Sequence, residues 1–277
     1  EIAFRMLSAR ASRHGFSANL AMLFKDAPFL DRLKRAKSAG FDAVEISTPE
    51  LFDHSPSEVA EALQTEGLQC VLFNMPAGDW GAGDRGIAAL PGRDFQRSLA
   101  LTTEYAARLQ CPRVHCLAGL TAAGASDEIY CRNLQAAVRT LGAEGVEVVI
   151  EPINQRSMPG YHLSSLPHAA DTIAAVSASL SGNCSGALKL LFDVFHCQIM
   201  HGDLTANLRK YADLIGHVQI AGVPDRAEPD HRQEVNYPHI FRLLRDELGY
   251  TGHIGLEYNP RQRTEDGLSW LALDARG

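Results

Sequence analysis

The chain has 277 residues, of which 45% are hydrophobic and 21% charged, and its formal net charge is −7. These proportions are ordinary for a soluble globular protein. No long basic run occurs, which argues against a nucleic-acid partner, and no apolar stretch approaches the roughly 20 residues that cross a membrane. A barrel of eight βα units needs about 250 residues, so the length permits one such domain.

The N-terminus and the cysteines both favour a cytoplasmic protein. The first 14 residues contain Arg but no apolar core, unlike a signal peptide. We interpret residues 1–15 as an N-terminal extension, with Met6 as the natural start and the residues before it as added ones. The six cysteines form no CxxC pair, which favours free thiols in a reducing compartment over secretory disulfides.

Eight short apolar runs recur along the chain and predict strands. They are apolar nearly throughout rather than alternating, as expected of parallel strands that are covered on both faces. In chain order the predicted strands are Phe16–Met22, Ala43–Ser47, Leu68–Met75, Arg113–Ala118, Glu147–Ile153, Ala187–Phe195, Gly216–Ala221 and Gly252–Tyr258.

Amphipathic segments between these runs predict helices. The first helix begins after Asp26 and Pro28 and ends before Gly40, a typical arrangement of start and stop residues. Further helices with one apolar face are predicted over Phe95–Leu109, Glu128–Leu141, Asp203–Leu214 and Asn236–Leu248.

The alternation of strand and helix, repeated about eight times, predicts parallel βαβ units with right-handed crossovers. Such units close into a barrel or form an open doubly wound sheet. The first strand-to-helix loop, Met22–Asp26, contains no glycine and no GxGxxG motif, which disfavours a dinucleotide-binding sheet. We therefore predict a single (β/α)8 TIM barrel over residues 16–277.

One predicted loop is unusually long. Pro76 to Arg93 follows the third strand and contains five glycines together with Trp80 and Arg85. Long loops at the carboxyl ends of barrel strands commonly cover active sites. We interpret this segment as a covering loop rather than a disordered excursion.

Four polar residues lie near the carboxyl ends of four successive apolar strands: Glu151, Asp193, Gln219 and Glu257. Each alone is more often a structural residue that satisfies its own hydrogen bonds. Together they fall on the face where barrel enzymes carry their active sites. Buried carboxylates titrate, pair or bind a metal, and ligands that are all oxygen suit Mg²⁺ or Mn²⁺ better than Zn²⁺.

Other polar residues flank this group. His196 follows Asp193 by three positions and is a candidate substrate contact, although a helix-capping histidine is the alternative. Arg226 follows the seventh strand and could bind a carboxylate bidentately, or pair with Asp225 or Glu228. His115 and Glu45 also end strands and are weaker candidates. We interpret His217 as a packed core residue and the remaining histidines as surface or loop residues. No HExxH, GxSxG or P-loop motif occurs.

Several long segments resemble one family of isomerases. They are PAGDWGAGDRGIAALPGR, IEPIN followed by RSMPGY, FDVFHCQIMHGDLT, HVQIAGVPDRAEPD, EVNYP and GLEYNP. They are similar to hydroxypyruvate isomerase and its relative 2-oxo-tetronate isomerase, which belong to the xylose isomerase-like barrels alongside the ketose 3-epimerases. The likeness extends from Phe16 to about Trp270.

The resemblance implies roles for matching residues. Glu151 and Glu257 resemble the paired glutamates that bind metal and transfer the proton, and Asp193 and Gln219 resemble the remaining metal ligands. His196, Arg226, Arg85, Trp80 and His115 are the predicted substrate contacts. Epimerases typically carry His at the position of Gln219, which favours the hydroxypyruvate branch. Two segments depart from the family pattern, ISTPELF after Glu45 and PDHRQEVNY after Glu228, and they leave the substrate open.

The implied reaction is the interconversion of hydroxypyruvate and 2-hydroxy-3-oxopropanoate through an enediolate. A divalent metal, Mg²⁺ or Mn²⁺, would chelate the substrate oxygens, one glutamate would remove a proton and the other return it, and Arg226 or Arg85 would hold the carboxylate. A four-carbon 2-oxo acid and a ketose are alternative substrates. An endonuclease on this fold would need a basic groove, and a non-catalytic binding barrel would bind no divalent metal. A homo-oligomer is compatible with the sequence.

Overall fold

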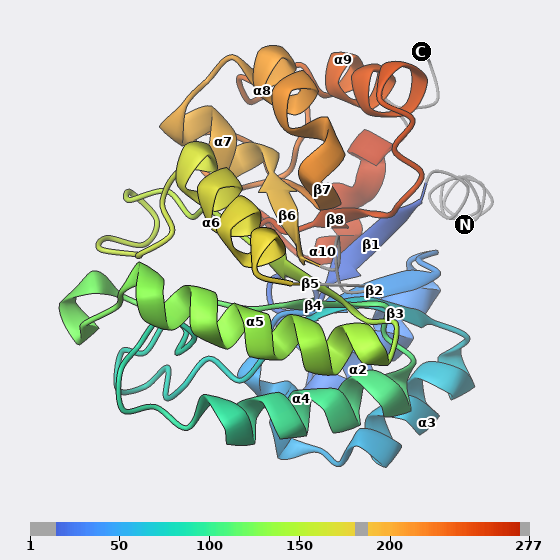
Figure 1. Ribbon diagram of the computed structural model, residues 1–277. Helices are drawn as coiled ribbons and strands as arrows, with labels where there is room; N and C mark the ends of the chain where they lie inside the picture. Colours follow the sequence, from blue (N-terminus) through green and yellow to red (C-terminus); the bar gives the residue numbers. More distant parts are fainter. Residues whose placement is uncertain (1–14, 181–187, 272–277) are drawn as a thin grey trace.

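The computed structural model describes residues 15–180 and 188–271, and within them eight parallel strands close into a barrel in sequence order (Figure 1). The predicted fold is therefore confirmed. The strands are β1 Phe16–Asn19, β2 Ala43–Ile46, β3 Gln69–Asn74, β4 Arg113–His115, β5 Glu147–Ile150, β6 Leu188–Asp193, β7 Ile215–Ile220 and β8 Ile254–Leu256.

Most strands end earlier than their apolar runs predict. The predicted strand Glu147–Ile153 ends at Ile150 in β5, and Phe195 belongs to a helix instead of β6. This helix starts early because the side chain of Asp193 accepts a hydrogen bond from the backbone N–H of Phe195 at 2.8 Å. The polar residues at these ends are thus placed at the mouth of the barrel. Ala187, the predicted start of the sixth strand, lies outside the described residues.

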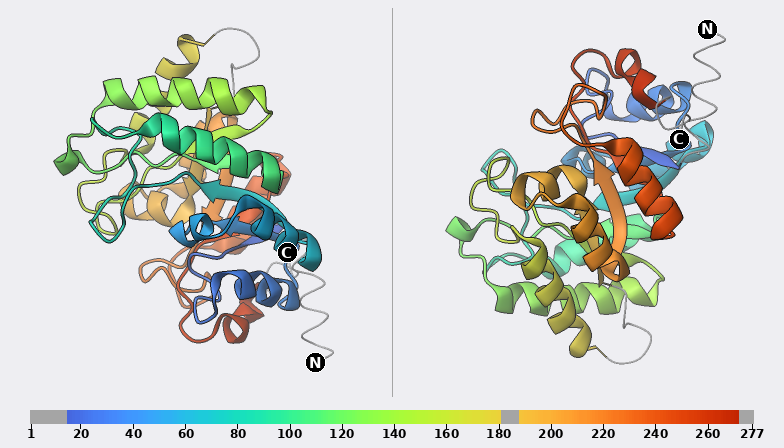
Figure 2. Two further views of the ribbon diagram at one scale, coloured as in Figure 1. Left: turned by 90° about the horizontal axis from the view of Figure 1, so that it is seen from below. Right: turned by 90° about the horizontal axis from the view of Figure 1, so that it is seen from above.

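Helices cover the outside of the barrel on all sides (Figures 1 and 2). They are α2 Phe29–Ser38, α3 Pro56–Glu66, α4 Phe95–Leu109, α5 Asp127–Ala143, α6 Leu166–Ala178, α7 Val194–Met200, α8 Leu204–Tyr211, α9 Tyr237–Arg242 and α10 Thr264–Gly267. Short 3-10 turns lie at η2 Pro49–Asp53, η3 Thr121–Ala123 and η5 Ala212–Leu214, and a π-helical turn at η6 Leu243–Glu247. In the described part of the chain, no helix has both the length and the apolarity of a membrane crossing.

The predicted helices are present, and α4 has the predicted bounds. The predicted helix Asn236–Leu248 continues past α9 as the π-helical turn. The helices α3 and α6 were not predicted from apolar periodicity. A local signal for α3 exists, because Ser55 and Glu58 form a capping box around its first turn.

The first and last units of the barrel meet and complete its outer layer. In Figure 2, α10 lies beside α2. Arg35 of α2 pairs with Glu265 of α10 at 2.7 Å, and the backbone N–H of Phe24 donates to Thr264 Oγ1 at 2.7 Å. These contacts hold the loop after β1 in place. Residues 1–14 of the predicted N-terminal extension lie outside the described residues.

The inside of the barrel is part apolar and part polar. Leu72, Val149 and Leu191 form a small buried cluster that is separate from the main core. Leu72 and Leu191 are in register with Glu45 and His217, which contact each other inside the barrel. Apolar packing therefore fills one side of the interior, and a buried polar network occupies the other.

The long loop from Pro76 to Arg93 is folded onto the barrel. Gly86 forms an antiparallel bridge with Ala118, and its φ of +115° belongs to the region that favours glycine. A Cβ at this position would lie 2.6 Å from the backbone of Leu117. The loop is anchored further by Asn133, which donates to the carbonyl of Ala88 at 2.8 Å.

Candidate active site

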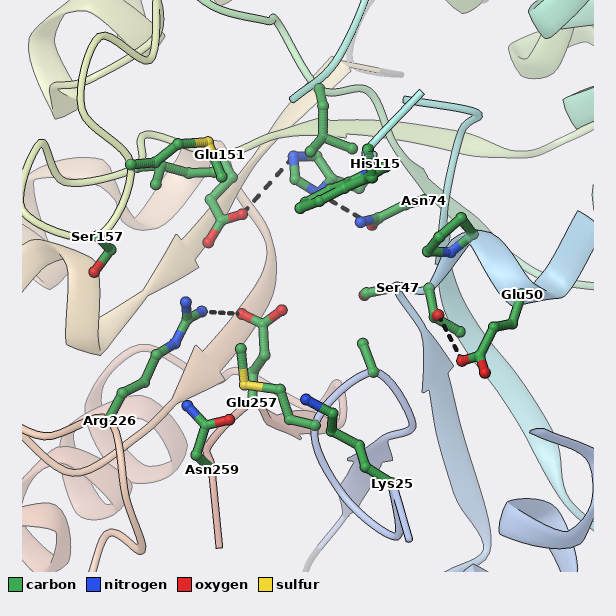
Figure 3. Close-up of a pocket in the computed structure, with 18 of the residues that line it drawn as sticks. Lys25, Ser47, Glu50, Asn74, His115, Glu151, Ser157, Arg226, Glu257 and Asn259 are labelled. Carbon is green, nitrogen blue, oxygen red and sulfur yellow. Dashed lines mark hydrogen bonds and ion pairs between the residues drawn. The ribbon is translucent and has the colours of Figure 1, made fainter. Parts of the chain in front are cut away.

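A pocket of about 480 Å³ opens at the carboxyl ends of the strands (Figure 3). Six of the predicted site residues line it: Glu151, Glu257, His115, His196, Arg226 and Trp80. Asp193 and Gln219 are buried at the carboxyl ends of β6 and β7 and do not line the pocket. Arg85 does not line the pocket. Its guanidinium stacks 4.5 Å from the ring centroid of Trp80, which reaches the pocket from the long loop.

Glu151, Asp193 and His196 converge in the floor of the pocket. Their potential ligand atoms lie within 4.8 Å of one another, and His196 Nε2 is 3.6 Å from both Glu151 Oε1 and Asp193 Oδ2. Both oxygens are buried and accept no hydrogen bond. Burial, together with the charges of Glu257 and Asp193, raises the pKa of Glu151 well above its usual value, and burial raises the pKa of Asp193 to about 6.

Gln219 adds a third buried oxygen without a donor. Its Nε2 donates to Glu45 Oε2 at 2.7 Å, which fixes the orientation of the amide. Its Oε1 has no hydrogen-bond partner. Buried polar atoms in folded proteins are almost always paired. The unpaired acceptor oxygens of Glu151, Asp193 and Gln219 are of the ligand type that hard divalent cations prefer.

The imidazole of His196 is held as a hydrogen-bond donor. Its Nδ1 accepts the backbone N–H of Asn154 at 3.3 Å, so the proton of the neutral ring is on Nε2. Burial lowers the pKa of His196 well below its usual value, so the ring is neutral. The Nε2–H therefore faces Glu151 and Asp193. In this tautomer Nε2 can donate to an oxygen of a bound ligand, and Asn154 is a positioning residue that the sequence did not reveal.

Glu257 and Arg226 form the opposite wall of the pocket (Figure 3). The guanidinium of Arg226 is 2.6 Å from Glu257 Oε2 and 3.6 Å from Asp193 Oδ2. Asn19 of β1 donates to the other oxygen of Glu257 at 3.3 Å. Burial raises the pKa of Glu257 to about 7, and the nearby Arg226 limits the increase. Arg226 pairs with these carboxylates and not with Asp225 or Glu228, the sequence neighbours that were the alternative partners.

His115 lies across the pocket from Arg226. Its Nε2 is 3.8 Å from Glu151 Oε2, and its Nδ1 contacts Asn74 Oδ1 at 3.2 Å. Since Asn74 Oδ1 can only accept, the proton of the ring is on Nδ1 and Nε2 is free to accept. Burial lowers the pKa of His115 to about 3. A neutral histidine thus presents an unpaired nitrogen to the pocket.

A polar network around Glu45 supports the site from below. Glu45 accepts from Ser17 at 2.9 Å and from Asn19 at 3.1 Å, and it contacts His217 Nε2 at 2.5 Å. His217 is therefore the packed core residue that the sequence predicts. Gly255 of β8 makes room for this network, because a Cβ there would collide with the carboxylate of Glu45.

Comparison with known proteins identifies the family of this barrel. The model of the family described as xylose isomerase-like TIM barrel matches residues 33–273. This chain belongs to the xylose isomerase-like TIM barrel family. It is 44% identical to the 2-oxo-tetronate isomerase of Cupriavidus necator, over 92% of this chain and 96% of the relative. It is 40% identical to the hydroxypyruvate isomerase of Escherichia coli, over 92% and 97%.

Among solved structures, this xylose isomerase-like barrel is similar to one titled AP endonuclease, family 2, from Brucella melitensis. The TM-score is 0.87 and the identity 40%, over 94% of this chain and 98% of that chain. The names of the curated relatives confirm the resemblance drawn from the sequence motifs, and they place this member of the family among isomerases.

The structure of this xylose isomerase-like barrel also brings together residues that the sequence analysis missed. Asn19 and Asn74 each end an apolar strand, so the rule that identified Glu151 would have found them had it been applied to β1 and β3. Lys25, Ser157 and Asn259 line the pocket from loops, and no strand-end signal marks them. Loop residues of this kind are placed only by the fold.

A second cluster of possible ligands lies away from the pocket of this family member. His162 Nε2 and His168 Nε2 are both 2.8 Å from Asp127 Oδ1. The carboxylate of Asp127 is largely exposed and both imidazoles contact its Oδ1, so the two hydrogen bonds account for the geometry. The sequence analysis interpreted both histidines as surface or loop residues. His162 does lie in a loop, but His168 lies in α6, and both side chains are partly buried.

Proposed function

We propose that this protein is a metal-dependent isomerase that interconverts hydroxypyruvate and 2-hydroxy-3-oxopropanoate by proton transfer through an enediolate. The observation that supports the proposal is a group of buried acceptor oxygens at the carboxyl ends of three successive strands, on Glu151, Asp193 and Gln219, that accept no hydrogen bond. Two relatives that are 40–44% identical over nearly their full lengths are named as isomerases of small 2-oxo acids.

The proposed metal ligands are Glu151, Asp193, Gln219 and Glu257. All four offer oxygen, and this ligand type suits Mg²⁺ or Mn²⁺. His196 is not included, because its Nδ1 accepts the backbone N–H of Asn154 and its Nε2 carries a proton. When bound, the cation supplies Lewis acidity that stabilises negative charge on the substrate oxygens.

Glu151 and Glu257 are the proposed proton-transfer residues. They project into the pocket from opposite walls (Figure 3), so a planar enediolate between them has one carboxylate on each face. General acid–base catalysis is most effective when the pKa of the group lies near the working pH. In the metal-free site burial raises the pKa of Glu257 to about 7, and a bound cation would lower it from this value.

The other pocket residues would bind and orient the substrate. His196 Nε2–H would donate to a substrate oxygen and His115 Nε2 would accept from a hydroxyl group. Arg226 would hold Glu257 and Asp193 in place, and Trp80, braced by Arg85, would cover the open side.

The test is metal removal and restoration. Treating the protein with a chelator should abolish hydroxypyruvate isomerisation, and adding Mg²⁺ or Mn²⁺ should restore it. The Asp193→Asn variant should bind Mn²⁺ about 10- to 100-fold more weakly, as measured by calorimetry, because it loses a charged ligand. Full activity in the chelated protein, or unchanged Mn²⁺ binding by the variant, would refute the proposal.

A four-carbon substrate is the second candidate. The pocket volume of about 480 Å³ exceeds what a three-carbon acid fills, and one of the reported relatives is named 2-oxo-tetronate isomerase. Comparing kcat/KM for hydroxypyruvate and for 2-oxo-tetronate under the same metal conditions separates the two. A ketose 3-epimerase is a weaker candidate than either acid isomerase, because epimerases typically carry His at the position of Gln219. The net charge of −7 disfavours an endonuclease.

A further inference from the structure

Three cationic side chains line the pocket in the described ranges, and two of them are already paired. Arg32 forms two hydrogen bonds with Glu50, at 2.7 and 2.9 Å. Arg226 contacts Glu257 at 2.6 Å and Asp193 at 3.6 Å. Lys25 lines the same pocket, and no ion pair or hydrogen bond of its side chain occurs within the described residues. Its ammonium group is therefore available to a ligand.

The loop after β1 presents Lys25 in a defined conformation. The preceding residue, Phe24, has a φ of +58°, which a bulky residue adopts only when its surroundings enforce it. The Phe24 side chain is fully buried and its backbone N–H donates to Thr264 at 2.7 Å. On either side of Lys25, Arg32 donates to the carbonyls of Leu20 at 3.0 Å and Ala27 at 2.9 Å.

The direction of the side chain follows from this loop. Figure 3 shows the ammonium end of Lys25 turned toward the pocket, on the side of Glu257 and Asn259. An unpaired lysine at the surface normally extends into solvent. Here hydrogen bonds to Arg32 of α2 and Thr264 of α10 fix the backbone on both sides of Lys25, so its Cα has a defined position at the edge of the pocket.

The charges of the site indicate what Lys25 would bind. Glu151, Asp193 and Glu257 place three carboxylates around the pocket, and they repel an anionic substrate. Arg226 and a divalent cation together would neutralise these three charges. Lys25 then adds one positive charge that no protein group offsets, which matches a substrate with one carboxylate.

We propose that Lys25 selects the anionic substrate by pairing with its carboxylate, while Arg226 stays with Glu257 and Asp193. The inference rests on the proposed isomerisation of a 2-oxo acid and names the residue that makes the site specific for acids over neutral sugars. Lys25 is a specificity residue in this proposal and takes no part in proton transfer.

The kinetic test compares Lys25→Gln with Lys34→Gln in the metal-loaded enzyme. Lys34 is an exposed lysine of α2 that lines no described pocket, so its variant removes the same charge elsewhere. Lys25→Gln should raise KM for hydroxypyruvate about ten-fold with kcat within about two-fold, because a charge-assisted hydrogen bond is lost. Lys25→Arg should recover most of the affinity, and Lys34→Gln should match the parent. Equal KM values for the two glutamine variants would overturn the proposal.

A binding test separates this proposal from the isomerase assignment. Glycerate has a carboxylate but no carbonyl, so it cannot be isomerised, and glycerol is its neutral counterpart. In ligand-observed NMR titrations, Lys25→Gln should weaken glycerate binding about ten-fold and leave glycerol unchanged. Equal weakening of both ligands would overturn the role of Lys25. Lys25-dependent glycerate binding by a protein inactive on 2-oxo acids would refute the isomerase function and leave the carboxylate site standing.

Discussion

Two groups of buried carboxylates lie close together in this barrel, and their surroundings differ. Glu45, inside the barrel, accepts hydrogen bonds from Ser17, Asn19 and Gln219 and contacts His217. Burial acts to raise its pKa, but His217 and the other donors lower it below the usual value. Glu45 is therefore a charged group whose partners are all supplied by the protein.

Glu151 and Asp193, at the carboxyl ends of β5 and β6, are less completely partnered. One oxygen of each is buried with no donor, and burial raises both pKa values. Gln219 belongs to both groups, since its nitrogen bonds to Glu45 and its oxygen is left free. The comparison teaches that burial alone does not mark a functional carboxylate. The missing donor is what separates the two groups, because buried polar atoms in folded proteins are almost always paired with protein, water or an ion.

The largest expected effect is on catalysis, from Glu151→Gln. Because the Glu151 oxygen has no protein donor, the substitution removes a charge without breaking a hydrogen bond. We expect kcat to fall about 10²- to 10⁴-fold while Tm stays the same or rises. The exposed Glu144→Gln is the control for steady-state kinetics and thermal unfolding. An unchanged rate, or a Tm lower by several degrees, would contradict the distinction drawn here.

The second prediction concerns Glu45, the buried carboxylate whose partners are all supplied by the protein. Glu45→Gln should lower the free energy of unfolding by about 1–3 kcal/mol, because it removes an acceptor from a fully buried hydrogen-bond network that includes Ser17 and Gln219. Urea unfolding measures this change. Glu50→Gln is the matched control, since Glu50 pairs with Arg32 but its side chain is 44% exposed, and it should cost no more than about 1 kcal/mol. A similar loss in both variants would remove the contrast between the two groups.

The third prediction is the pH dependence of the metal-free protein. Glu257 and Asp193 have pKa values raised to about 7 and about 6, above those of the unfolded chain. Between about pH 4 and 7 these two groups therefore bind more protons in the folded state than in the unfolded state, so their own contribution to stability falls as pH rises. A divalent metal should reverse this trend near pH 7. The difference in Tm between the parent and Glu257→Gln, measured from pH 4.5 to 7.5 with and without Mn²⁺, isolates the Glu257 part of this contribution. A metal-free difference that shifts in favour of the parent as pH rises would contradict it.

The smallest expected effect is in the covering loop. Arg85→Ala removes the stacking of Arg85 on Trp80, an exposed cation–π contact worth about 0.5–1 kcal/mol. We expect KM to rise about two- to five-fold with kcat and Tm unchanged. Arg93→Ala, which breaks an exposed ion pair with Asp84 in the same loop, tests whether the effect depends on Trp80. A rise in KM well beyond five-fold in Arg85→Ala would mean that Arg85 contacts the substrate directly.

Local patterns in the sequence determined the barrel and part of its site. Apolar runs and amphipathic segments depend on neighbours within a few residues, so they revealed eight βα units. The parallel arrangement then placed Glu151, Asp193, Gln219 and Glu257 at one end, because all strands of such a barrel end on the same face.

Only the tertiary structure decided how these groups are partnered. Asn19 reaches Glu257 across 238 positions of sequence, and Arg226, Lys25 and Arg85 take their places from loop conformations. The protonated nitrogen of His196 depends on one backbone N–H of Asn154, 42 residues away. Such contacts depend on strand register and loop geometry, which no local pattern encodes. The sequence therefore identified the chemical groups of the site, and folding determined which of them are left free to bind.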